Sequence, residues 1–140
     1  MALKASTLKV GDSKTLVVVD DLTRTQIVMY AGAGGDYNPL HTDDKFTKEI
    51  AGYPGVFAHG MLTMGMTGRV ITDWVGDGRI TVYEVQFRVQ VWPGDTLTAT
   101  ATVSNVYNEG GQDYADFDIV TLNQKDETVL IGKATAKIDA

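Results

Sequence analysis

The sequence predicts an α+β fold in which one long apolar helix lies in the concave side of a curved antiparallel β-sheet. Residues 61–75 are apolar almost all round a helix, and a helix without a polar face is a buried one. Residues 83–138 change to a period of two, with turn residues between the alternating runs. Packing the helix on one face of the sheet buries the apolar surface of both elements. At 140 residues we expect one domain, residues 1–140.

The strands are predicted from this alternation. Residues 83–91 alternate apolar and polar side chains, Pro93-Gly94 suits a type II turn, and residues 97–103 alternate again. We expect this second strand to pair back on the first. Turns at 108–111 and 123–126 separate two further strands, at 114–122 and 128–138. One face of the last strand is small enough for a large element to sit against it, through Leu130, Gly132, Ala134, Ala136 and Ile138.

The first half predicts shorter elements around an irregular segment. Residues 15–19 form a β-branched strand, and Thr23 with Gln26 has the capping-box form that begins a helix ending near Gly32. Residues 35–54 lose periodicity, although a turn or two of helix is expected at 44–50. Asp43 or Asp44 would cap this helix, and an aspartate that does not cap it would be a solvated charge. In the long helix, Gly65 and Gly68 each cost about 1 kcal/mol, which indicates close approach of another backbone.

Composition excludes several function classes. The net charge of −6, without any basic cluster, argues against nucleic-acid binding. The absence of cysteine excludes disulfides, a thiolate nucleophile and cysteine zinc sites. Residues 1–10 lack the apolar stretch of a signal peptide, and no run of about 20 apolar residues could span a membrane. We expect a cytoplasmic protein.

The chemistry-bearing residues gather in and beside the irregular segment. The only two histidines are His41 and His59, and Asp36 precedes His41 by five residues across Pro39. A tight turn at the proline can bring Asp36 and His41 to opposite sides of one water, as an acid-base pair for hydration. Backbone N–H groups near Gly60, where the long helix begins, suit a developing oxyanion, and glycine lets a ligand approach closely.

Structural explanations compete with these roles. Asp36 and Asn38 could simply form Asx turns, and His59 could be a helix cap or a packing residue. A metal site of Asp36, His41 and His59 is conceivable, but neither a close histidine pair nor a metal-binding helix signature is present. The serines lack a nucleophile elbow, so a serine hydrolase is not supported.

Two motifs carry a family resemblance. Residues 33–43, AGGDYNPLHTD, closely resemble the hydratase motif of MaoC-like hot-dog proteins, and residues 58–62, AHGML, resemble their second motif. The resemblance implies that Asp36 and His41 are catalytic, that Asn38 supports their turn, and that the Gly60 amide helps form the oxyanion hole. Residues 58–87 look most like the catalytic subunit of mycobacterial-type (3R)-hydroxyacyl-carrier-protein dehydratase.

The implied function is a hydro-lyase of fatty-acid metabolism. It would hydrate trans-2-enoyl thioesters of coenzyme A or acyl-carrier protein, or dehydrate (3R)-hydroxyacyl thioesters. The predicted substrate contacts are Asn38, Phe57, His59 and Met61. No cofactor or metal is expected, and the partner is a second hot-dog unit, in a homodimer or heterodimer. The alternatives are a hot-dog acyl thioesterase and a non-catalytic acyl-binding subunit.

Overall fold

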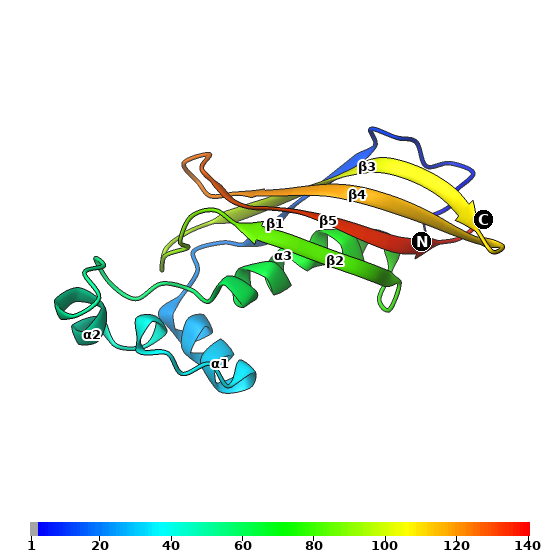
Figure 1. Ribbon diagram of the computed structural model, residues 1–140. Coiled ribbons are helices and arrows are strands. Elements are labelled where there is room, and N and C mark those ends of the chain that lie inside the picture. Colours follow the sequence, from blue (N-terminus) through cyan, green and yellow to red (C-terminus); the bar gives the residue numbers. More distant parts are fainter. Residues whose placement is uncertain (1–2) are drawn as a thin grey trace.

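The computed structural model describes residues 3–140, so Met1 and Ala2, the first residues of the predicted domain, lie outside the described residues. Five antiparallel strands form one sheet in the order β1-β3-β4-β5-β2. Helix α3 lies against one face of this sheet (Figure 1). The strands are β1 (Ser13–Val19), β2 (Ile80–Phe87), β3 (Leu97–Glu109), β4 (Gln112–Leu122) and β5 (Thr128–Ile138). The helices are α1 (Arg24–Gly34), the 3₁₀ turn η1 (Pro39–His41), α2 (Asp44–Glu49) and α3 (Gly60–Val75).

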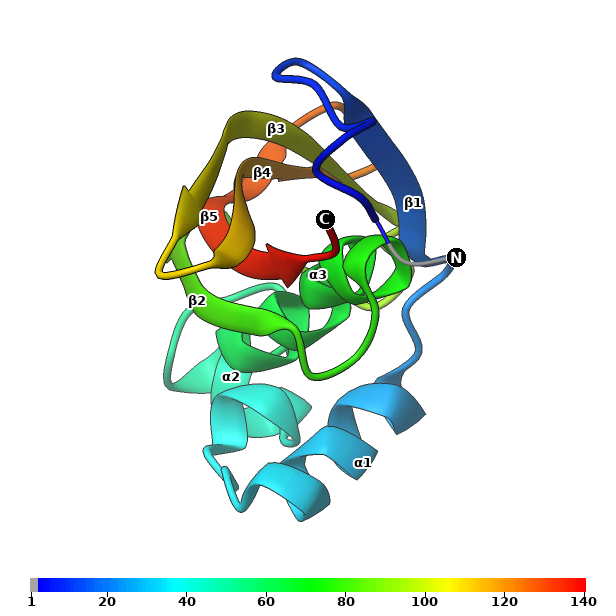
Figure 2. The same ribbon diagram turned by 90° about the vertical axis from the view of Figure 1, so that its right-hand side faces the viewer.

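Helix α3 occupies the concave side of the sheet, as the sequence predicts. Figure 2 shows the strands curving around it. Its buried positions are Thr63, Thr67, Gly68, Val70, Ile71 and Val75. The helix nevertheless has an exposed stripe, because every fourth residue from Met61 through Gly65 and Arg69 to Asp73 is open to solvent. The expectation of a helix buried on all sides is therefore wrong for this stripe, which the other described residues do not cover.

The predicted pairing of the two strands around Pro93-Gly94 is wrong. The turn itself is type II, since Gly94 has φ 93° and the Asp95 N–H donates to the Trp92 carbonyl at 3.0 Å. The strands on either side do not meet: β2 pairs with β5, whereas β3 pairs with β1 and β4. Strand β2 ends at Phe87, earlier than expected. The Arg88 N–H still donates to the Val129 carbonyl of β5 at 2.9 Å, but beyond it the Val91 carbonyl accepts from the Ala58 N–H at 2.8 Å.

The glycines of α3 do not meet another backbone, so that prediction is also wrong. A Cβ at Gly68 would lie 3.3 Å from the ring of Tyr83, and one at Gly65 would meet nothing within 4 Å. The close backbone approach lies in the sheet instead, at Gly132 of β5, where a Cβ would collide with the carbonyl of Glu84 in β2. Gly132 thus lets the edge strand come close.

Helices α1 and α2 lie beyond the end of the sheet (Figure 1). The predicted capping box of Thr23 is present, and Asp43 caps α2. Asp44 is more than a solvated charge, because its Oδ1 accepts from the Val56 N–H at 3.2 Å and its Oδ2 pairs with Arg24 at 2.7 Å. These bonds tie the middle of the irregular segment to α1 before it and to Val56 after it. Within residues 3–140, no helix has the length and apolar content to cross a membrane.

Candidate active site

The turn between α1 and η1 positions the predicted acid-base pair. Asp36 Oδ1 accepts from the Asn38 N–H at 3.2 Å, and Asn38 Oδ1 accepts from the Leu40 N–H at 3.0 Å. Pro39 then begins the 3₁₀ turn, where its missing N–H costs nothing. The Asx turns that the sequence offers as a structural explanation are therefore real, and they place Asp36 and His41 on the same side of the loop.

His41 is held with one ring nitrogen bonded and the other available. Its Nδ1 lies 2.6 Å from the Phe57 carbonyl, and a carbonyl only accepts, so Nδ1 carries the proton. The Nε2 lone pair then faces Asp36 Oδ2 across 3.9 Å. That separation is too long for a direct hydrogen bond and fits a water that touches both groups. The His41 side chain is 11% exposed and that of Asp36 is 54% exposed, so the pair opens to solvent on the Asp36 side.

A third residue, His59, contacts both members of this pair. Its ring stacks on the ring of His41 with centroids 3.8 Å apart and an interplanar angle of 27°. Its Nε2 lies 3.1 Å from the backbone carbonyl of Asp36. The side chain is buried, at 2% exposure. Substrate contact by His59 stays a prediction.

The same three residues form the group that the sequence allows as a metal site, with ligand atoms within 4.8 Å of one another. Their geometry does not suit one. An imidazole binds a metal in the plane of its ring, and two stacked, nearly parallel rings cannot both direct an in-plane lone pair at one ion. One nitrogen of each ring already lies against a backbone carbonyl. The arrangement suits proton transfer better than metal binding.

Helix α3 begins directly after His59, the residue that contacts Asp36 and His41. Gly60 is its first residue, so its N–H has no partner within the helix. The ring of Phe87 covers this position and lies 3.0 Å from where a Cβ would stand. Gly60 therefore makes room for Phe87 as well as for any ligand. Met61, a predicted substrate contact, is exposed in the first helical turn.

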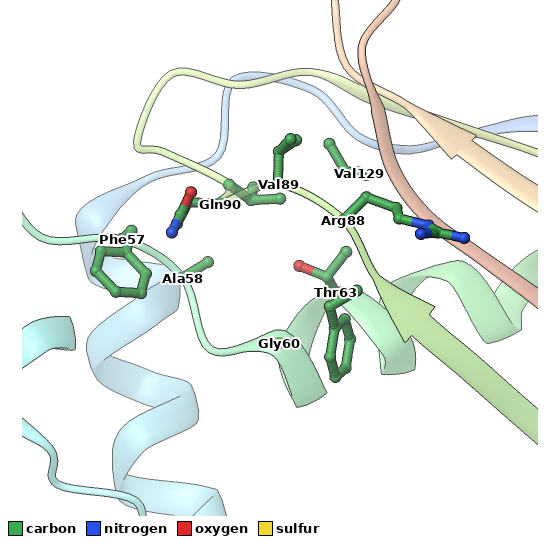
Figure 3. Close-up of a pocket in the computed structure, with 10 residues that line it drawn as sticks. Phe57, Ala58, Gly60, Thr63, Arg88, Val89, Gln90 and Val129 are labelled. Carbon is green, nitrogen blue, oxygen red and sulfur yellow. The ribbon is translucent and has the colours of Figure 1, made fainter.

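A cavity of about 270 Å³ adjoins the site (Figure 3). It shares Phe57 and Gly60 with the site, but Asp36 and His41 do not line it. In Figure 3 the Thr63 hydroxyl is directed toward the space between the lining residues. The lining residues are Phe57, Ala58, Gly60, Thr63, Phe87, Arg88, Val89, Gln90, Val91 and Val129.

The sequence does not single out Thr63 or Phe87 as site residues. A signal for Phe87 was available, because it continues the alternation of Tyr83 and Val85 and so belongs to the sheet face that covers α3. Thr63 lies one turn after Gly60, on the buried side of the helix. Sequence spacing alone cannot tell a threonine that packs in the core from one that faces a cavity.

Residues 7–122 match the protein family described as MaoC like domain. An (R)-specific enoyl-CoA hydratase from Rhodospirillum rubrum is 30% identical over 135 residues, which are 95% of this chain and 90% of that protein. A 3-hydroxyacyl-thioester dehydratase Y from Mycobacterium tuberculosis is 36% identical over 83 residues, 57% of this chain but only 29% of that protein. The chain thus spans less than a third of the length of several curated relatives that it matches.

Among solved structures, the unliganded R-hydratase PhaJ1 from Pseudomonas aeruginosa superposes with a TM-score of 0.86 at 21% identity. The match covers 99% of this chain and 86% of that one. At this identity the likeness bears on the fold alone. It confirms the predicted hot-dog fold, a long helix wrapped by a curved antiparallel sheet.

Proposed function

The chain belongs to the family of MaoC-like domains, and from this premise we propose that it adds water reversibly to trans-2-enoyl thioesters. The reverse reaction dehydrates (3R)-hydroxyacyl thioesters of coenzyme A or of acyl-carrier protein. The names of the hydratase and dehydratase relatives support this reaction class. The cytoplasmic location expected from the sequence belongs to the same proposal, and cell fractionation tests it.

The proposed mechanism uses Asp36 and His41 as the catalytic pair. His41 Nε2 takes one proton of a water that Asp36 Oδ2 holds from the other side. The water oxygen bonds to C3 of the enoyl group, and a proton passes from the imidazolium to C2 on the same face. Between these events the thioester oxygen carries negative charge. The amide at Gly60 and the positive end of α3 stabilise that charge.

One observation carries the proposal: the contact between His41 Nδ1 and the Phe57 carbonyl, from which the tautomer of His41 follows. The 2.6 Å hydrogen bond from Nδ1 to the Phe57 carbonyl leaves the proton acceptor at Nε2, on the side of Asp36. A hydration needs a neutral base in this state, with a second polar group to orient the water. Phe57 takes part through its backbone, and its ring meets the His41 ring edge to face at 5.4 Å.

Enoyl-thioester absorbance tests the proposal directly. We expect the purified chain to lower the absorbance of trans-2-enoyl-CoA, and Asp36→Asn and His41→Ala to lose at least about 100-fold in kcat, the loss expected when a general acid or base is removed. The matched control is Asp43→Asn, which replaces a nearby carboxylate by an equally good helix cap. Release of free thiol would indicate a thioesterase. Binding of the thioester by the wild-type chain without any turnover would indicate a non-catalytic subunit. Either result would overturn the proposal.

The partner in this proposal is a second hot-dog unit that pairs with strand β2. This strand is at the edge of the sheet, so one row of its backbone groups has no neighbouring strand among the described residues. Val82, Phe87 and Met61 expose apolar side chains at or beside it. An apolar edge strand of this kind is suited to association. Light scattering would report the mass of the purified chain, and Val82→Lys should lower it to that of one chain.

A further inference from the structure

His59 contacts both members of the proposed catalytic pair and a third aromatic ring. Its Nε2 lies 3.1 Å from the Asp36 carbonyl, and its ring stacks on His41 at 3.8 Å. Tyr30 of α1 meets it edge to face at 4.9 Å. With 2% of its surface exposed, His59 is enclosed by these contacts.

One of the two ring nitrogens of His59 is buried without a hydrogen-bond partner among the described residues. The Asp36 carbonyl can only accept, so Nε2 carries the proton and Nδ1 carries a lone pair. Within residues 3–140 this buried Nδ1 has no hydrogen-bond partner. An unpaired buried polar atom destabilises a fold, and an apolar side chain would avoid that penalty. Packing alone therefore does not explain an imidazole at this position.

Helix capping does not explain it either. His59 is the N-cap residue of α3, but its side chain makes no hydrogen bond to the first helical turn. Serine, threonine, asparagine or aspartate would serve better there. What an imidazole provides at this position is a flat face toward His41 together with a donor toward Asp36.

We propose that His59 is a positioning residue that holds Asp36 and His41 at their working separation, an inference that rests on the proposed function. The bond to the Asp36 carbonyl ties an exposed turn to the start of a buried helix. The stacked face limits rotation of the His41 ring, which also bonds to the Phe57 carbonyl and meets the Phe57 ring edge to face. A catalytic pair works best when rigid elements support it to within about 0.5 Å.

Three variants separate the two contacts. His59→Gln places its amide nitrogen about as far from the backbone as Nε2 and can still donate to Asp36, whereas His59→Asn is too short to do so. His59→Phe keeps the aromatic face and loses the donor. We expect kcat to fall in the order wild type, His59→Gln, His59→Asn, with about a tenfold loss for His59→Asn and for His59→Phe, the size expected for one lost hydrogen bond. KM should stay within about twofold, because a positioning residue acts through Asp36 and His41 rather than through the substrate.

A merely structural role would give a different result. Thr67→Val, which breaks a buried hydrogen bond elsewhere in α3, is the control for lost stability and should leave kcat unchanged. Equal kcat for His59→Gln and His59→Asn would overturn the inference. A rise in KM at unchanged kcat would also overturn it and would favour the substrate contact that the sequence predicts.

The failure of this inference is distinguishable from failure of the proposed function. If Asp36→Asn and His41→Ala stay active, the proposed function fails, whatever His59 does. If they are inactive and His59→Phe is fully active, only the positioning role fails. Imidazole nitrogen NMR adds a readout without substrate, since the chain has two histidines. The wild type should show one ring protonated at Nδ1, His41, and one protonated at Nε2, His59. In His59→Asn, the His41 signal should shift toward a mixture of tautomers. An unchanged His41 signal would contradict the positioning role.

Discussion

The ring of Phe87 lies 3.0 Å from the point that a Cβ at Gly60 would occupy. Strand β2 thereby places an aromatic ring directly over the first residue of α3. Because Phe87 is 49% exposed, this ring can turn toward solvent when it is displaced. The relationship couples the end of a sheet strand to the helix amides that the proposed mechanism uses.

Gly60→Ala should therefore affect activity more than stability. The new methyl group keeps the backbone amide but displaces the Phe87 ring, and we expect kcat/KM to fall by about tenfold or more, since small misplacements at a reacting centre are costly. The melting temperature should change little, because alanine favours a helix more than glycine does. The double variant Gly60→Ala/Phe87→Ala should recover part of the loss. Full activity of Gly60→Ala alone would show that the ring does not matter.

The buried hydroxyl pair of Thr67 and Thr121 should stabilise the contact between α3 and β4. Their Oγ1 atoms lie 2.9 Å apart, and both residues are buried. Thr67→Val or Thr121→Val leaves one hydroxyl unpaired, and we expect each to lower the free energy of unfolding by about 1 to 3 kcal/mol. The double variant should cost less than the sum, as urea unfolding would measure.

The exposed pair of Thr15 and Thr100 is the matched control for that cycle. Its Oγ1 atoms are also 2.9 Å apart, but solvent can replace either hydroxyl. We expect a coupling free energy near zero there. Equal coupling in the two pairs would contradict the idea that burial makes the Thr67 bond important.

Tyr83 should make stability sensitive to alkaline pH. Burial raises its pKa from 10.0 to about 12, and its hydroxyl donates to the Met64 carbonyl at 2.5 Å. Because the folded pKa lies above the unfolded one, this stabilisation is complete below pH 10 and is lost as pH rises through about 12. Tyr83→Phe should cost about 1 kcal/mol at neutral pH and flatten the alkaline decline.

Urea midpoints measured from neutral pH to about pH 12 would check this prediction. Tyr37→Phe is the control, because Tyr37 is exposed and its removal should leave the alkaline decline as it is in the wild type. An unchanged decline in Tyr83→Phe would assign it to other groups.

Asp44 should make the local stability of the irregular segment sensitive to low pH. The hydrogen bond from Arg24 holds the pKa of Asp44 below 3.8, with a second bond from the Val56 N–H. Since the folded pKa is the lower one, this stabilisation is present above pH 3.8 and is lost as pH falls through the folded value. We expect Asp44→Ala to speed hydrogen exchange at Val56 and in α2 at neutral pH, and Lys48→Ala, which removes a looser 3.9 Å pair, to leave it unchanged.

Local sequence determined much of the fold and the place of the site. The capping box of Thr23, the turn at Pro93-Gly94 and the bounds of α3 all follow from interactions within a few residues, and the structure has them. The motif at residues 36–41 likewise builds its own Asx turns. Backbone preferences and side-chain periodicity suffice for such features, because each depends on neighbours in the chain.

Tertiary structure alone decided which elements and side chains contact one another. Strand β2 pairs with β5 rather than with β3, and the chain between β2 and β3 hydrogen-bonds to the loops at Ala58 and Leu22 instead of turning back as a hairpin. Phe87 over Gly60 and His59 against His41 are likewise contacts between segments brought together by the packing of α3 in the sheet. Periodicity reports that a side chain has a buried face, but the identity of its neighbour depends on how all the elements pack at once.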